Sequence, residues 1–451
     1  MRQSKNAGID MTGGSLWRKI PAFAAPVVLG GILQQLYGVA DAAIVGNFVG
    51  RGALAAVGMS LPMTVVAVGF LSGMSSGAGA VTARAFGAGS DTDMRRAVHT
   101  AVALSAALGA VVSVGGWFAT APLLRLMRTP GDIFGETQSY FRVYLAGMLA
   151  ASVYNMGAAI LGAFGETRKP VLFLVVSSAL NIALDLLFVL ALNMGVTGAA
   201  LATLIAQTVS ATLMLLTLTR GDIPAKLRLA QLGFDIAALK QIVRIGLPVG
   251  AERLINGVTN IMLQAYINGL GSIYAAGWGV TNRIDAFIYT LTGAFASSVV
   301  TCVGQNIGAG QTARARKGVR VTLTLCCSAA LAVSAALLAL NTRVLRIFTP
   351  DAEILGAAFA FMRILTATYW IDGAVIIFSD ALAGTGRALS ATVINTATHV
   401  IIRQAYLFVI SRVWYTPTAV ALCYPLAWVA AIPALYIVYR RIDWRKFERR
   451  A

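Results

Sequence analysis

The stretches "SSGAGAVTARAFGAGSDTDMRRAV" (75–98) and "SSVVTCVGQNIGAGQTARARKGV" (297–319) are two versions of one pattern. Each runs from a Ser-Ser pair through a Gly-Ala-Gly into a basic segment, and the two Gly-Ala-Gly tripeptides lie 221 residues apart. Two further pairs keep nearly the same spacing, 222 and 219 residues: Pro26 with Pro248, and Gly165 with Gly384. A nearly constant offset at three places indicates an internal repeat that covers both halves of the chain.

The composition is that of a membrane protein. Hydrophobic residues make up 58% of the chain and charged residues 12%, whereas a soluble domain carries about 25% charged residues. A helix of roughly 20 apolar residues spans a bilayer, and the hydropathy pattern leaves no room for a separate soluble domain. We predict an all-α membrane protein with about twelve transmembrane helices, at residues 20–46, 53–79, 97–121, 137–163, 170–192, 196–218, 241–269, 273–300, 319–340, 356–382, 389–412 and 417–439.

The positive charges predict the orientation of these spans. If the N-terminus lies inside, the inner segments hold 25 Lys and Arg residues and the outer segments hold 7. Cytoplasmic loops carry the excess of Lys and Arg, so both termini are expected in the cytoplasm. The net charge of +18 is therefore explained by topology, and no nucleic-acid partner is expected. The first span is too long for the core of a signal peptide.

The repeat predicts two lobes of six helices. The N-terminal lobe is expected at 1–218, a basic cytoplasmic linker at 219–240, and the C-terminal lobe at 241–451. Each half has an even number of spans and enters from the same side, so a pseudo-two-fold axis along the membrane normal should relate the lobes. Transporters bind substrate between such repeats and rock one against the other. This organisation favours a transporter.

Isolated carboxylates lie inside the apolar segments. Asp41, in "LYGVADAAIVGNFVG" (36–50), is the only charged residue between Lys19 and Arg51. Asp185 is likewise the only charged residue in its span. Ionisable residues inside membrane spans are costly and usually face a cavity or a partner. Both aspartates are therefore candidates for a functional site.

Three polar residues lie at a similar depth to these aspartates. Tyr37 is one helical turn from Asp41, and Asn181 is one turn from Asp185, so each pair shares a helix face. Thr203 enters at a similar depth from the sixth span. Burial and a second nearby carboxylate both favour the protonated form of a carboxyl group, so this set could bind a proton or a monovalent cation. The alternative is a pair of hydrogen-bonded aspartates that brace two helices.

Three stretches carry a resemblance to a known family: "GWGVTNRIDAFIYTLTGAFASSVVTCVGQNIGAGQTARARKGV" (277–319), "GETRKP" (165–170) and "NIALD" (181–185). The chain resembles the multidrug and toxic compound extrusion (MATE) family over nearly its whole length, and is most similar to its prokaryotic DinF-like and staphylococcal-exporter-like members. The resemblance implies export of organic cations or other amphipathic compounds in exchange for protons or sodium ions, in the cytoplasmic membrane of a prokaryote. We expect a monomer without a cofactor.

The resemblance also implies roles for the polar residues of the first lobe. In DinF-like members, aspartates of the first and fifth spans are implicated in cation coupling together with a neighbouring Asn and Thr. Asp41, Asp185, Asn181 and Thr203 match these positions in type and spacing, and Tyr37 is a weaker match. A sodium ion could bind at Asp41 and Asp185.

The second lobe has polar residues of its own. Asp372 lies in the middle of the tenth span and matches an aspartate that joins the cation site in some MATE relatives. Asp285 and Arg283 are two residues apart in the eighth span, so they do not share a helix face. These three residues are candidates for a substrate or second cation site. Ion pairs that hold helices together are the alternative.

Pro26 lies inside the first span, fifteen residues before Asp41. Proline removes a backbone donor and can kink a helix. The kink could transmit a change of charge at Asp41, which makes Pro26 a candidate hinge. A static bend is the alternative.

Two other classes of function are open to the sequence. A flippase for a lipid-linked sugar would need a strongly cationic cleft and usually more than twelve spans. An intramembrane aspartyl protease could use Asp41 and Asp185, but the Gly-x-Gly-Asp context is absent from the sequence. The two histidines and four cysteines do not have metal-ligand spacing, so neither an enzyme nor a transition-metal site is expected.

Overall fold

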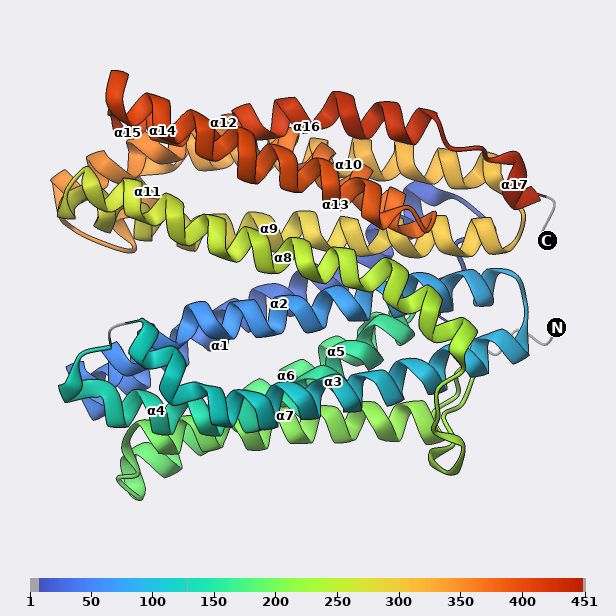
Figure 1. Cartoon of the computed structure of the whole chain (residues 1–451), viewed down its shortest axis with the longest axis horizontal. Helices are drawn as coiled ribbons and strands as arrows, with labels where there is room; N and C mark the ends of the chain where they lie inside the picture. The colour runs from blue at the N-terminus through green and yellow to red at the C-terminus, as the bar shows by residue number, and fades with distance from the viewer. Residues whose placement is uncertain (1–7, 128, 449–451) are drawn as a thin grey trace. The chain divides into compact units, whose positions relative to one another are not determined.

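A computed structural model describes residues 8–127 and 129–448, where the regular structure is helical (Figure 1). Helices suit a membrane because they satisfy their backbone hydrogen bonds internally. Three of the short segments (η1, η2 and η4) are π-helical and η3 is a 3₁₀ turn. In chain order the elements are α1 (Leu16–Ile44), η1 (Val45–Val49), α2 (Arg51–Gly87), α3 (Asp91–Leu126), α4 (Gly131–Ala146), α5 (Met148–Ala163), α6 (Arg168–Asp185), η2 (Leu186–Ala191), α7 (Gly195–Arg220), η3 (Leu229–Gln231), α8 (Ile236–Gly269), α9 (Ser272–Gly308), α10 (Thr312–Ala339), α11 (Asn341–Arg346), α12 (Ala352–Gly384), α13 (Ala388–Thr396), η4 (Ala397–Ile402), α14 (Arg403–Val413), α15 (Pro417–Ala421), α16 (Cys423–Arg440) and α17 (Arg445–Glu448).

The helices reproduce the predicted spans. Among the described residues, 10 helices are long and apolar enough to cross a membrane, and the bent pair α4–α5 brings the number to 11. The predicted span 241–269 lies in α8, which has 34 residues but also charged and amide side chains that make it less apolar. The predicted span 137–163 is not one straight helix, because α4 and α5 meet at an angle of 41°. The all-helical membrane fold is thus confirmed.

The repeat is visible in the backbone as well as in the sequence. Glycines with positive φ recur at an offset of 221 residues at three places, where they end or join helices. Glycine adopts such φ values more readily than any residue with a side chain. The sequence analysis matched Gly165 with Gly384, but the residue that has the same backbone conformation as Gly165 in the second half is Gly386. The three pairs are Gly50 with Gly271 (φ 119° and 113°), Gly89 with Gly310 (66° and 68°), and Gly165 with Gly386 (80° and 81°).

The chain folds into two compact units. Of the described residues, the first unit contains 8–10 and 25–250, and the second contains 11–24 and 251–448. Two long helices are therefore shared: the start of α1 belongs to the second unit, and the start of α8 belongs to the first. The units follow packing contacts and so differ at these two helices from the lobes predicted from the repeat.

The segment before α1 is anchored in both units. The backbone N–H of Ile9 donates to the carbonyl of Gly165 in the first unit, at 2.9 Å. Met11 is the first residue of this segment that belongs to the second unit. Its N–H donates to Oε1 of Gln305 in that unit, at 2.7 Å. Nε of Arg314 donates to the carbonyl of Met11 at 2.9 Å. Each unit thus holds its own part of this segment.

Small residues bring α2 and the first part of α8 close together inside the first unit. A Cβ atom on Gly73 would lie 2.4 Å from Cα of Gly250, and a Cβ atom on Gly77 would lie 2.5 Å from the backbone nitrogen of Gly246. Each helix therefore presents two glycines four residues apart, the spacing that lets membrane helices approach closely.

The predicted linker, 219–240, packs on the start of α3. The N–H of Arg228 donates to Nε2 of His99 at 3.0 Å, and the N–H of Asp235 donates to Oγ1 of Thr100 at 3.0 Å. Asp235 also pairs with Arg96 at 3.7 Å. His99, which suggested no site in the sequence, thus holds the linker in place.

Candidate functional site

The first unit brings together the five polar residues that the sequence singled out there. Tyr37 and Asp41 come from α1, Asn181 and Asp185 from α6, and Thr203 from α7. Asp41 is 9% exposed and Asp185 is 0% exposed. We call these five residues the polar cluster. Its members are one turn apart on α1 and on α6, as the 3.6-residue period of a helix requires.

Thr203 is the centre of the hydrogen bonds in the polar cluster. Its hydroxyl accepts a hydrogen bond from Nδ2 of Asn181 at 3.3 Å. It also shares a hydrogen bond of 3.3 Å with the hydroxyl of Tyr37. These contacts connect α1, α6 and α7 through one side chain.

The two carboxyl groups face each other. Asp41 and Asp185 are close enough for a hydrogen bond between their side chains when one of them holds a proton. In the described part of the chain, both carboxyl oxygens of Asp185, Oδ1 of Asp41 and Oδ1 of Asn181 lack a hydrogen-bond partner. Buried oxygens rarely stay unsatisfied, so these atoms can share a proton between the two carboxyl groups or bind a small cation.

The chemistry of the polar cluster fits a proton or a small monovalent cation. Two carboxylates this close are difficult to ionise together, so a bound positive charge stabilises the pair. Oxygen atoms are the ligands that hard cations prefer. The described residues contain no group of three or more His, Cys, Asp or Glu side chains of the kind that holds a metal ion.

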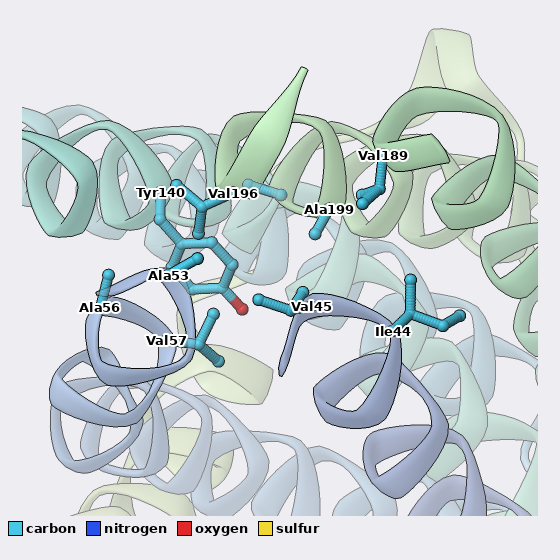
Figure 2. Close-up of a cluster of buried hydrophobic side chains, with 10 residues drawn as sticks. Ile44, Val45, Ala53, Ala56, Val57, Tyr140, Val189, Val196 and Ala199 are labelled. Carbon is cyan, nitrogen blue, oxygen red and sulfur yellow. The ribbon is translucent and has the colours of Figure 1, made fainter. Parts of the chain in front are cut away.

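Two tyrosines of α4 extend the polar cluster, and the sequence analysis missed them. Tyr140 is 6% exposed and lies near both Asp41 and Asp185. Figure 2 shows its ring among aliphatic side chains that include Val57. Tyr144, one turn further along, stacks on Tyr140 with ring centroids 6.1 Å apart. The signal was present in "YFRVY", whose tyrosines lie at a depth similar to that of the aspartates.

The backbone changes from α-helical to π-helical shortly after each of the two aspartates. The π-helical segment η1 begins four residues after Asp41, and η2 begins directly after Asp185. The two segments contact each other. Such π-helical turns occur frequently at functional sites, and here both lie beside the carboxyl pair.

Pro26 lies within α1, which continues as a helix on both sides of it. Within α1, the part that belongs to the second unit ends at residue 24 and the part that belongs to the first unit begins at residue 25, next to Pro26. A hinge at Pro26 stays a prediction.

The second unit contains separate acidic residues. The Tyr369 hydroxyl donates to Oδ1 of Asp285, and Asp285 and Asp372 lie near each other. Asp372 is 4% exposed, and its Oδ2 lacks a hydrogen-bond partner among the described residues. Arg283 is exposed, and its place in a substrate site stays a prediction. Glu252 accepts a hydrogen bond from Nδ2 of Asn395 at 2.8 Å.

Comparisons with known proteins place this geometry in a family. The MatE family model matches residues 26–187 and 248–407, which together are more than half of the chain. The chain is 25% identical over 442 residues to the probable multidrug resistance protein YoeA of Bacillus subtilis, with 96% of this chain and 95% of that protein covered. It is 22% identical over 432 residues to the multidrug export protein MepA of Staphylococcus saprophyticus, with 94% of each covered.

A solved structure shows the same fold over the whole chain. This is the outward-facing conformation of a multidrug resistance MATE family transporter of the MOP superfamily, with a TM-score of 0.90, 23% identity and 100% of both chains covered. The proteins of this family are transporters and not enzymes. The match of the family model across both repeats, with relatives covered almost end to end, shows that the chain belongs to the MATE family of multidrug efflux transporters.

Proposed function

We propose that this transporter is an antiporter, which expels amphipathic or cationic drugs in exchange for protons or sodium ions that bind at the polar cluster. The observation that carries the proposal is the facing pair Asp41 and Asp185, buried in a membrane protein with unsatisfied oxygens. We propose that an ion that neutralises this pair binds one conformation of the protein better than the other. That difference is what allows a ligand to shift a conformational equilibrium.

The proposal is tested by dye efflux from proteoliposomes under an imposed proton gradient or an imposed sodium gradient. We expect one of the two gradients to drive transport and the other to leave it at the level of empty liposomes. Transport that is equally fast without any gradient would contradict antiport.

A cationic substrate is supported by the acidic residues of the second unit. Asp372 is buried with a free carboxyl oxygen and lies near Asp285, whose Oδ1 accepts a hydrogen bond from the Tyr369 hydroxyl. Carboxylates and tyrosine rings both attract organic cations. The efflux assay therefore compares a cationic dye with an anionic dye of similar size, and transport of the anionic dye alone would contradict this substrate class.

We propose that one copy of the chain suffices for transport.

We propose that the chain lies in the cytoplasmic membrane with both termini and the linker 219–240 inside. A cysteine at Ala230, which is exposed, should react with an impermeant thiol reagent only after the cells are permeabilised. Ala225 is unsuitable, because it is 1% exposed and would resist labelling on either side. An exposed cysteine at Ala352, in a predicted outer segment, is the control and should react in intact cells.

The two cysteine variants must be made in a protein whose native cysteines do not react with the thiol reagent. Three native cysteines are buried and Cys327 is half-buried, so Cys327→Ser is included in both variants. Labelling of the Ala230 variant in intact cells would reverse the proposed orientation.

A further inference from the structure

The fourth span is broken next to the polar cluster. α4 and α5 meet at 41°, and Gly147 joins them. Its N–H donates at 3.0 Å to the carbonyl of Tyr144, three residues back, and the regular pattern resumes where Ala151 donates to the carbonyl of Gly147 at 3.0 Å. A sharp bend in a helix needs an identifiable cause, and the sequence of this span contains no proline.

Side chains from two neighbouring helices hold the break. On α3, the hydroxyl of Ser113 accepts from the N–H of Leu149 at 3.1 Å and is 3.5 Å from the carbonyl of Ala146. Serine side chains are one means by which membrane proteins satisfy backbone groups freed at a helix break. On α7, Gln207 lies so close that a Cβ atom on Gly147 would be 2.5 Å from its Oε1. A larger residue at this position would require the Gln207 side chain to shift.

The residues at the break also reach the polar cluster. The Tyr144 hydroxyl lies within hydrogen-bonding reach of the Gln207 side-chain amide, while Oε1 of that amide is buried without a partner among the described residues. Tyr144 stacks on Tyr140, which lies near Asp41. α4 and α7 pack on each other (Figure 1).

A second connection runs along α7. Gln207 is one turn after Thr203, the centre of the hydrogen bonds in the polar cluster, so the two side chains share a face of α7. Tyr140 and Tyr144 share a face of α4 for the same reason. One face of α4 and one face of α7 thus connect the polar cluster with the break at Gly147.

We infer that Tyr144 and Gln207 are positioning residues that couple the charge of the Asp41–Asp185 pair to the bend at Gly147. The inference rests on the proposed function, because it needs an ion to bind at that pair. Neutralising the pair weakens its attraction for the Tyr140 hydroxyl, and the stacked Tyr144 moves with it. This movement changes the position of the Gln207 amide relative to Gly147. The angle between α4 and α5 changes as a result. Tyr37, Tyr140 and Tyr144 are the titratable groups that face the pair from α1 and α4.

The first test is steric and uses gradient-driven efflux from proteoliposomes. Gly147→Ala places a methyl group against Oε1 of Gln207 and should lower the maximal rate about tenfold or more. The double variant Gly147→Ala with Gln207→Ala removes the clash and should recover most of the rate. Gly135→Ala is the matched control, because it lies in the same helix and its Cβ would meet nothing within 4 Å. A Gly147→Ala protein with the wild-type rate would overturn the inference.

The second test separates coupling from simple support of the fold. Tyr144→Phe removes one hydroxyl and keeps the stacked ring, so it should shift the ion concentration, or the pH, at which efflux is half-maximal. Ser113→Ala loosens the break without touching the polar cluster, so it should change the rate and leave that half-maximal point in place. If Tyr144→Phe leaves the ion dependence unchanged, the inference fails, even where Gly147→Ala prevents folding.

The Asp41→Asn variant distinguishes the two possible failures. If Asp41→Asn abolishes coupling while the Tyr144 and Gly147 variants behave as wild type, the coupling site stands and the link to the bend is wrong. If Asp41→Asn also behaves as wild type, the proposed function of the polar cluster is wrong.

Discussion

Asp41→Asn should reduce gradient-driven efflux to the level of empty liposomes. Asparagine has almost the same size as aspartate and keeps hydrogen-bonding capacity, but it is neutral in every state of the transport cycle. Antiport needs a group that is charged when the site is empty and neutralised when the ion binds, because only differential binding shifts the conformational equilibrium. The variant removes that difference and should leave folding intact.

The measurement is dye efflux under the gradient that drives the wild type, together with drug binding to the purified protein. Binding should survive in Asp41→Asn, which shows that the protein is folded. Asp132→Asn is the control, because Asp132 is an exposed acid in the same unit and should keep the wild-type rate. Efflux by Asp41→Asn at the wild-type rate would mean that the carboxylate is structural and that coupling occurs elsewhere, with Asp372 as the first candidate.

Gly77→Val should destabilise the protein more than any conservative change at the polar cluster. A Cβ atom on Gly77 would be 2.5 Å from the backbone nitrogen of Gly246, and backbone atoms cannot move aside as a flexible side chain can. Overpacking of this kind costs about 1–3 kcal/mol, and more where the backbone must shift. We expect a Tm lower by several degrees and a smaller yield of monodisperse protein.

The control for this prediction is Gly58→Val. Gly58 lies in the same helix, and a Cβ atom there would meet nothing within 4 Å. Its Tm in detergent should match that of the wild type. Equal Tm values for Gly77→Val and the wild type would show that α2 and α8 do not pack through their glycines.

The sequence predicted the polar cluster because its signal is local. A lone carboxylate in an apolar span is visible without any structure, and Asn181 and Tyr37 follow from helical spacing. Depth, judged from the ends of the spans, added Thr203. Each of these steps needs only the pitch of a helix and the cost of a buried charge.

The sequence could not predict features that depend on a partner helix. The break at Gly147 needs Gln207 of α7 and Ser113 of α3, which are far away in the chain. The role of Tyr140 depends on α4 packing against the cluster, since a tyrosine near the end of a span is equally suited to the membrane interface. Arg283 is exposed, and its part in a substrate site together with Asp285 and Asp372 stays a prediction.

The crossing of α1 and α8 between the two units has a consequence for any attempt to divide the protein. A cut in the linker 219–240 looks natural, yet each product would lack a piece of itself. The N-terminal fragment would keep residues 11–24, which pack in the second unit, and would lose residues 241–250, which pack in the first. The two fragments should therefore be poorly soluble when they are expressed alone, and should reconstitute a transporter only when they are made together in the same cell.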